Sequence, residues 1–199
     1  MKTTRLSIVN IVAIVAIAAA LIIPNAEASV LWESDLGKGS INISIINEYG
    51  SIHLVPSPSS TMTISGSNGK ITLSESPSGQ HLSVIPPEDH SRPTDIKVMV
   101  PLVSQLNVTT LSGVIVSDEL SEMPMFFETK TGHITIAPQP TSNFDVSLKT
   151  SGEITVDFSI KIEQRWNIEP SKTGHITIGE GGVPMILESR RGNLSVLRR

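Results

Sequence analysis

The sequence contains no cysteine. Disulfide bonds, thiolate nucleophiles and cysteine-based metal sites are therefore excluded. A chain without cross-links has to be held together by backbone pairing and apolar burial. The stretch from residue 29 to residue 199 is long enough for one domain of this kind.

Basic side chains are also scarce. Without its first 28 residues the chain has 13 Lys and Arg against 18 Asp and Glu, a net charge of −5. Binding to nucleic acid needs a clustered basic surface. Nucleic acid is therefore not an expected partner.

Catalytic and cofactor motifs are missing as well. The sequence has no H-E-x-x-H, no G-x-S-x-G, no P-loop and no dinucleotide fingerprint, and its Ser, His and Asp residues are scattered. We therefore expect no enzymatic activity, no cofactor and no metal site. Apolar spacing of three and four is not sustained over ten residues anywhere from 29 to 199, which argues against helices there.

The first 28 residues have the three zones of a secretory signal. Lys2 and Arg5 precede an apolar run from residue 6 to residue 23, and Ala26-Glu27-Ala28 is a small-residue cleavage site. The segment 1–28 is thus interpreted as a signal peptide, with 29–199 as the mature domain. An uncleaved membrane anchor is the alternative, because the run approaches the length that spans a bilayer. Either way the domain is expected outside the cytoplasm.

A repeat dominates the rest of the chain. Its clearest copies are TKTGHITI (129–136), KTSGEITV (149–156), SKTGHITI (171–178) and SRRGNLSV (189–196), and looser copies start at residues 47, 66 and 110. A steady period of this length indicates one supersecondary unit per repeat. The repeat glycines are Gly50, Gly69, Gly113, Gly132, Gly152, Gly174 and Gly192.

Each repeat predicts two strands joined at its glycine. Aliphatic residues stand two and four positions after the glycine, as Ile134 and Ile136 do after Gly132, and this alternation indicates a strand with one buried face. A second alternating run precedes the glycine, which is placed at the turn because it accepts positive φ. Two all-β architectures fit: a single-stranded β-helix, or β-solenoid, with coils of roughly twenty residues stacked in parallel, and an antiparallel meander or sandwich.

We favour the β-solenoid, with six to eight short coils, because the copies match residue for residue, which stacking in register rewards. The most regular part is 106–196. The stretch from Pro56 to Pro93, rich in Ser, Pro and Gly, is predicted to form less regular coils or a long loop.

Copies of Ser/Thr-Gly-x-Ile/Val-Thr/Ser-Ile/Val behind an export signal resemble the adhesin family of DUF4097 type, which is related to the head domains of autotransporter adhesins. The resemblance covers most of 29–199 and is strongest from Leu106 to Val196. It implies a β-helix at the cell envelope and brings no catalytic residues with it.

Two sets of outward positions are candidate binding surfaces if the copies stack in chain order. The residues that follow the glycines, His133, Glu153 and His175, would form one column, with Asn193 beyond it. Two imidazoles and a carboxylate suit Zn or Cu, although solvated surface residues are the simpler interpretation. Three positions after the glycines stands a column of hydroxyl groups that suits a periodic ligand: Thr72, Thr135, Thr155, Thr177 and Ser195.

Two further features have plain interpretations. Sequons for glycosylation occur at Asn42, Asn107 and Asn193, each in or beside a predicted strand. Arg190, Arg191, Arg198 and Arg199 flank the last predicted strand. We interpret them as charges that protect an open sheet edge from strand addition, with binding of a polyanion as the alternative.

The predicted function is an exported, non-catalytic, adhesin-like binding domain with an extended surface. Its expected partner is a surface polymer, a glycan or an envelope protein, with the membrane involved only if 1–28 remains attached. A structural or assembly component of the envelope is the alternative. A polysaccharide-active enzyme is the third interpretation, and it requires a cleft lined with acids.

Overall fold

The structure is a computed structural model that describes residues 29–36, 41–66, 70–76, 79–85, 93–159, 161–165 and 171–198. The predicted signal peptide 1–28, Gly69, Asn167 and Arg199 lie outside these ranges. All regular structure within them is β, so the all-β prediction is confirmed there. Among the described residues no helix has the length and apolarity to cross a membrane.

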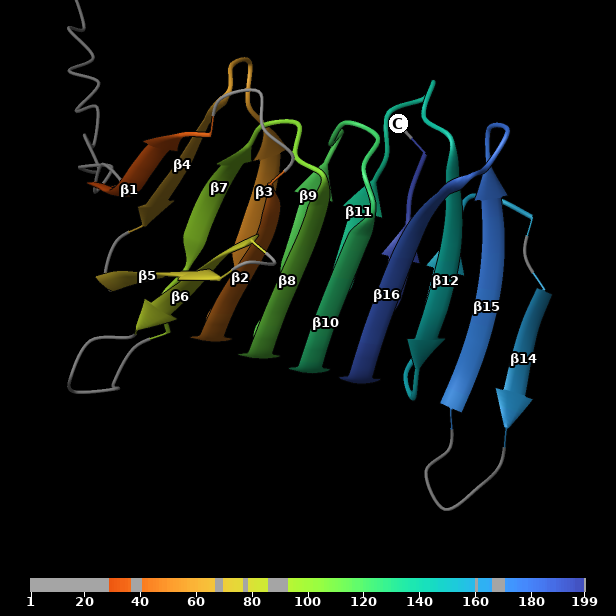
Figure 1. Ribbon diagram of the computed structural model, residues 1–199. Coiled ribbons are helices and arrows are strands. Elements are labelled where there is room, and N and C mark those ends of the chain that lie inside the picture. The colour runs from red at the N-terminus through yellow and green to blue at the C-terminus, as the bar shows by residue number, and fades with distance from the viewer. Residues whose placement is uncertain are drawn as a thin grey trace, which may run out of the picture.

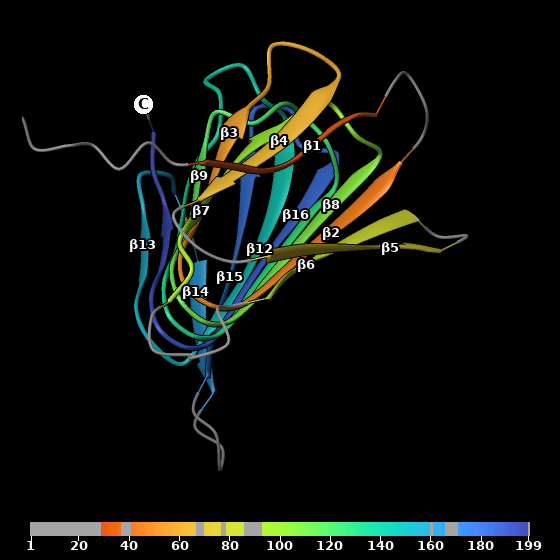
Figure 2. The ribbon, with the colours of Figure 1, turned by 90° about the vertical axis from the view of Figure 1, so that its left-hand side faces the viewer.

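The described strands form two mixed sheets, seen from the front and along the row of strands in Figures 1 and 2. Sheet A has eight strands in the order β1-β4-β7-β3-β9-β11-β17-β13. Its strands are β1 (Ser29–Asp35), β4 (Thr61–Gly66), β7 (Ile96–Val100), β3 (Ile52–Pro56), β9 (Ile115–Asp118), β11 (Ile134–Ala137), β17 (Leu194–Val196) and β13 (Ile154–Val156).

Sheet B has nine strands in the order β14-β15-β12-β16-β10-β8-β2-β6-β5. Its strands are β14 (Lys161–Arg165), β15 (Ser171–Ile178), β12 (Phe144–Thr150), β16 (Val183–Arg191), β10 (Met125–Thr131), β8 (Gln105–Ser112), β2 (Asn42–Tyr49), β6 (Gly79–Ile85) and β5 (Lys70–Ser76).

Five repeats share one design, which we call a rung: a strand of sheet B, a glycine corner, and a strand of sheet A. The rungs are β2–β3, β8–β9, β10–β11, β12–β13 and β16–β17, and neighbouring rungs pair in parallel in both sheets. Their register places like positions side by side, so that Ile115, Ile134 and Leu194 follow one another across sheet A. The alternating aliphatic side chains point inward and form one core between the sheets.

The order of the rungs in space differs from their order in the chain. Both sheets place β16–β17 between β10–β11 and β12–β13. Stacking in chain order is therefore wrong for the last two rungs, and the described residues contain five rungs where six to eight coils were expected. The loop 138–143 between β11 and β12 explains how this is possible, since six residues span up to roughly 20 Å and two strand spacings are about 10 Å.

The repeat 171–178 is not a rung. It forms one continuous strand, β15, which pairs antiparallel with β12 and β14, and Gly174 lies opposite Leu148 in the middle of it. The prediction that Gly174 marks a turn is therefore wrong. The turn comes later, at Gly179–Gly182, where three glycines have positive φ. At the other end of the stack, β5 pairs antiparallel with β6, and β4 pairs antiparallel with β1. The described part of 56–93 therefore contains antiparallel strands where less regular coils or a long loop were predicted.

The corner glycines are needed for space as much as for backbone conformation. Gly50, Gly113 and Gly132 have positive φ, but Gly152 and Gly192 do not. At four of the corners an added Cβ would lie closer than 3.0 Å to the carbonyl oxygen of the neighbouring corner, and at Gly50 it would lie as close to the carbonyl oxygen of Thr94. The rungs are thus stacked too closely for any side chain at this position.

Next to the corners runs a row of buried polar side chains that the sequence analysis missed. Ser189 Oγ donates to the carbonyl of Gly132 at 2.8 Å, and Asn47 Nδ2 donates to that of Thr94 at 2.8 Å. Thr110, Thr129 and Thr150 donate in the same way to the neighbouring corners. These five side chains are at most 2% exposed, so each is a buried polar group whose hydrogen bond goes to a corner carbonyl or to that of Thr94. Its sequence signal is Asn, Thr or Ser three residues before Gly, or two in the case of Thr150.

Candidate functional site

The outer face of sheet B carries two adjoining grooves. Along β12, β16 and β10 the side chains alternate between the core and solvent, which leaves Ser147, Lys149, Ile186, Glu188 and Glu128 on the outer face. These residues come from adjacent strands of the rigid parallel ladder. Their relative positions are therefore fixed by backbone hydrogen bonds.

One groove lies at the end of the strands nearest the glycine corners, which we call the corner groove. Its volume is about 500 Å³. Its lining is polar and charged and consists of Glu128, Thr129, Lys149, Thr150, Ser151, Ser171, Glu188, Ser189, Arg190 and Arg191.

A second groove of about 630 Å³ adjoins the first, toward β14 and β15. We call it the hairpin groove because Glu163, Thr173 and His175 of that hairpin contribute to its lining. Lys149 and Glu188 line both grooves, so the two form one continuous depression. Their charged groups are 3.6 Å apart. An exposed pair of this kind contributes little to stability, which leaves both groups available to a ligand.

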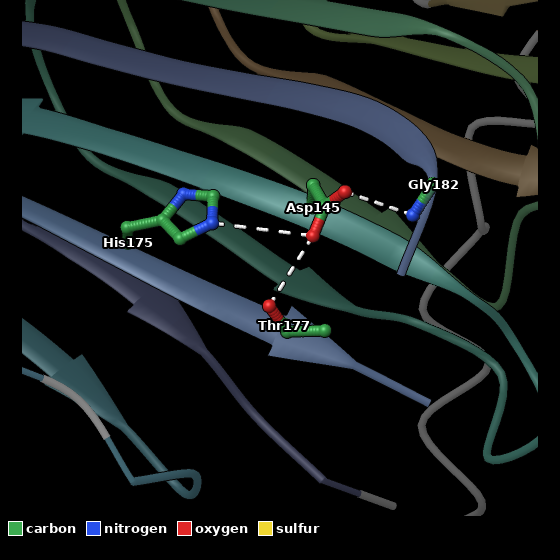
Figure 3. A network of polar contacts seen from close by, with 4 residues as sticks. All are labelled: Asp145, His175, Thr177 and Gly182. Atoms are coloured by element: carbon green, nitrogen blue, oxygen red, sulfur yellow. Dashed lines mark hydrogen bonds and ion pairs between the residues drawn. The ribbon is translucent and has the colours of Figure 1, made fainter. Parts of the chain in front are cut away.

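Asp145 lies near the start of β12, at the end of the strand away from the glycine corner, and its polar contacts are drawn in Figure 3. Its Oδ2 accepts a hydrogen bond from the backbone N–H of Gly182 at 2.8 Å, and its Oδ1 accepts one from Thr177 Oγ1 at 3.2 Å. His175 Nε2 lies 3.9 Å from the same Oδ1. Asp145 therefore ties β15 and the following glycine turn to β12, and we assign it a positioning role.

The predicted column of His133, Glu153 and His175 does not form. Asn193 stands between His133 and Glu153: its backbone N–H donates to His133 Nδ1 at 2.9 Å, and its Oδ1 accepts from the N–H of Glu153 at 3.0 Å. His175 is in the other sheet, opposite Ser147. The column fails because rung β16–β17 is inserted and the repeat at 171–178 is not a rung. Within the described ranges no three His, Asp or Glu side chains are grouped as metal ligands.

The predicted hydroxyl column forms in part. Thr135, Ser195 and Thr155 are neighbours on the outer face of sheet A. Thr177 and Thr72 lie in sheet B and do not join it.

The sequence analysis did not bring the groove residues together, because they belong to different copies of the repeat and to strands that are distant in the sequence. Lys149, Glu188 and Arg190 are ordinary charged positions two to four residues before a corner glycine. They become neighbours only through the order of the rungs. Of the sequons, Asn107 accepts a hydrogen bond from Gln105 at 2.9 Å and Asn193 from Glu153, so both asparagines already have a local role.

Comparison with known proteins finds a similar fold in one solved structure. No family model matches the chain, and no curated protein matches it, so membership of the DUF4097 type stays a prediction. A crystal structure from Clostridium sporogenes, described as a "putative cell adhesion protein", has a TM-score of 0.50 at 9% identity and covers 84% of this chain and 98% of its own. A "putative adhesin" from Bacteroides fragilis has a TM-score of 0.22 at 10% identity and covers 84% of this chain and 95% of its own, a score too low to indicate a shared fold. The described part of the chain thus shares an all-β fold with the first of these proteins.

Proposed function

We propose that this chain is an exported, non-catalytic binding domain of adhesin type that presents the outer face of sheet B at the cell envelope. The observation that carries the proposal is the continuous depression formed by the corner groove and the hairpin groove. It is shallow, polar and built on paired strands, which suits the recognition of an extended polymer or a partner protein.

Two other lines of support come from the fold and from the N-terminus. The chain shares its fold with a protein described as a "putative cell adhesion protein". The segment 1–28 has the zones of an export signal. We interpret the five parallel rungs as coils of a short β-solenoid whose last two coils have exchanged places and whose ends are closed by antiparallel strands.

The absence of catalysis is part of the proposal. The two glutamates of the corner groove, Glu128 and Glu188, lie on adjacent strands at matching positions of an open surface. One of them is paired with Lys149. A glycosidase flanks its bound sugar with two carboxyl groups, one of which acts as the acid. An exposed surface on which one of the two carboxylates is paired with a lysine does not favour that role.

Binding of the purified chain to whole cells and to a glycan array tests the proposal. Ser147→Trp places a large side chain in the hairpin groove, and Thr135→Trp adds the same side chain to the outer face of sheet A. We expect Ser147→Trp to lower binding at least about tenfold, which corresponds to about 1.4 kcal/mol, and Thr135→Trp to leave it unchanged. Equal binding by both variants, or no binding by the unmodified chain, would refute the proposed function.

The second candidate is an assembly component of the envelope, and one observation favours it. β13 is the last strand of sheet A, and its Ile154 and Val156 are only half-buried, whereas their equivalents Leu194 and Val196 are fully buried. Open edges of this kind accept further strands. Sedimentation over a range of concentrations separates the two candidates, because an assembly component self-associates as concentration rises.

A further inference from the structure

Among the described strands, β13 is the last one of sheet A, so one of its edges has no strand beside it. Its hydrogen bonds to β17 include one that Glu153 accepts from Leu194 at 2.8 Å and one that Asp157 donates at 3.1 Å. Successive residues of a paired strand direct their N–H and C=O groups to opposite sides. Those of Ile154 and Val156 therefore point to the open edge, which offers two donors and two acceptors to a further strand.

Sheet B extends further than sheet A at this end of the molecule. β12 and β13 belong to one rung, but sheet B continues past β12 with β15 and β14, as Figure 1 shows. Ile162 of β14 lies in one row with Gly174 and the buried Leu148, on the side that faces the core. No described strand of sheet A faces it, and it is 43% exposed. A strand added to β13 would extend the cover over this overhang and complete the burial of Ile154 and Val156.

The other edge strands have features that resist strand addition, and β13 lacks them. β1 has an irregular register with β4 between Val30 and Trp32, and β5 and β14 contain charged residues within the strand. Irregularities and charges of this kind protect open edges. β13 has neither a charge nor a proline, and its three residues equal the length of its neighbour β17.

Acidic side chains flank β13 at both ends. Glu153 and Asp157 alternate with the apolar side chains and are exposed on the outer face of sheet A. Asp157 Oδ2 accepts a hydrogen bond from the backbone N–H of Arg198 at 3.0 Å, while the guanidinium group of Arg198 lies 4.7 Å from the ring centre of Phe158. An incoming strand thus meets a carboxylate at either end of the edge.

A second copy of this chain does not complement the edge. Two β13 strands related by a twofold axis form the most hydrogen bonds when Ile154 of each copy pairs with Val156 of the other. This register places Glu153 of each copy opposite Asp157 of the other. Like charges directly opposite each other destabilise a sheet, whereas a strand with basic residues at these positions is attracted.

We propose that β13 is a second binding surface, which accepts an extended segment of a different protein as an added strand of sheet A. The segment carries, in order, a basic residue, an aliphatic residue, any residue, an aliphatic residue and a basic residue. This order suits parallel and antiparallel addition alike, because alternate residues of a strand face the same side. Main-chain hydrogen bonds supply the affinity, and the alternate side chains supply the specificity. The inference goes beyond the proposed function, since its surface and its class of partner differ from those of the grooves.

The first test uses two synthetic peptides, SKVTVKS and SEVTVES, with the purified chain. We expect SKVTVKS to bind at least about tenfold more tightly, because two attractive cross-strand pairs replace two repulsive ones. Amide hydrogen exchange is expected to slow more at Ile154 and Val156 than at Thr155, whose N–H is already directed to β17. Equal binding of the two peptides, or slower exchange at another edge strand instead, would overturn the inference.

The second test uses variants of the edge, each checked by its unfolding midpoint. Val156→Pro removes an N–H that points to the open side, so it leaves the hydrogen bonds to β17 in place and should weaken SKVTVKS binding at least about tenfold. Glu153→Lys should bind the two peptides equally, because one end of the edge then attracts each of them. Glu33→Lys, on β1 at the other end of sheet A, is the control and should behave as the unmodified chain does.

Four results contradict the inference: no binding of SKVTVKS by the unmodified chain, full binding by a folded Val156→Pro, an unchanged peptide preference in Glu153→Lys, and an equal change in Glu33→Lys. Self-association of the unmodified chain that Val156→Pro abolishes would also overturn it, because the occupant would then be a second copy. Binding to cells and glycans through the grooves is a separate measurement, so the proposed function stands or fails independently of these results.

Discussion

The close stacking of the glycine corners makes a prediction about Gly192, whose backbone does not need glycine for its φ. In Gly192→Ala the new Cβ would collide with the carbonyl oxygen of Gly132. Because that oxygen is backbone, the two rungs would have to separate by roughly 1.5 Å before an ordinary contact returned. Gly182→Ala is the matched control: Gly182 has a φ of 102° but has open space around its Cβ position.

The expected loss follows from the hydrogen bonds around this corner. Gly132 N–H donates to Arg191 at 3.0 Å, Ile134 N–H donates to Asn193 at 3.0 Å, and Ser189 Oγ donates to Gly132 at 2.8 Å. A separation of this size breaks all three, at about 1 kcal/mol each. Gly192→Ala should therefore lower the free energy of unfolding by at least about 3 kcal/mol, whereas backbone strain alone in Gly182→Ala costs about 1–2 kcal/mol.

Urea unfolding and thermal unfolding both measure this difference. For a domain of this size, 3 kcal/mol corresponds to a fall in Tm of about 6–12 °C. If Gly192→Ala unfolds at the same urea concentration as Gly182→Ala, the corners are not in backbone contact and the described stacking is wrong.

Two other predictions concern the buried polar row and the predicted metal column. Ser189→Ala removes the donor to the carbonyl of Gly132 and should lower the free energy of unfolding by about 1–2 kcal/mol in urea, whereas the exposed Ser147→Ala should change it by less than about 0.5 kcal/mol. Equal losses would mean that the row does not stabilise the corners. Titration with Zn²⁺ should leave the NMR signals of His133 and His175 and the Tm unchanged, because the two residues lie in different sheets; parallel shifts of both signals would refute that separation.

The individual strands, and which of their side chains are buried, could be predicted from the sequence. The spacing of Ile134 and Ile136 after Gly132 predicts a strand with one buried face, and both side chains are at most 1% exposed. The same rule holds for Leu194 and Val196. It holds because burial depends on the two-residue period of a strand, which a short segment contains in full. Ile154 and Val156 follow the same pattern and are less buried, since β13 has a neighbour on one side only.

The pattern of the segment 171–178 shows where local reasoning ends. The sequence of 171–178 matches that of 129–136 almost completely. Nevertheless, 171–178 forms one antiparallel strand, whereas 129–136 contains the end of one strand, a corner and the start of the next strand. The first residues of the two segments differ: Thr129 fills the buried polar position three residues before Gly132, whereas Ser171 in the corresponding position is only half-buried. A glycine is thus not enough for a corner, and the choice depends on which strand lies alongside.

The order of the rungs could not be predicted, and the grooves depend on it. Every rung offers its neighbours a polar donor, a glycine and two aliphatic side chains, so pairing of any two is locally satisfactory. The rungs differ in the chain that surrounds them. β15 pairs with one edge of β12, and the glycine turn at Gly179–Gly182 then leads β16 to the other edge of β12. The last rung in the chain, β16–β17, therefore lies between two other rungs and not at the end of the row. It carries Arg190 and Arg191 into the middle of sheet B, where no open edge needs protection, so the prediction that these two arginines guard the end of the stack is wrong.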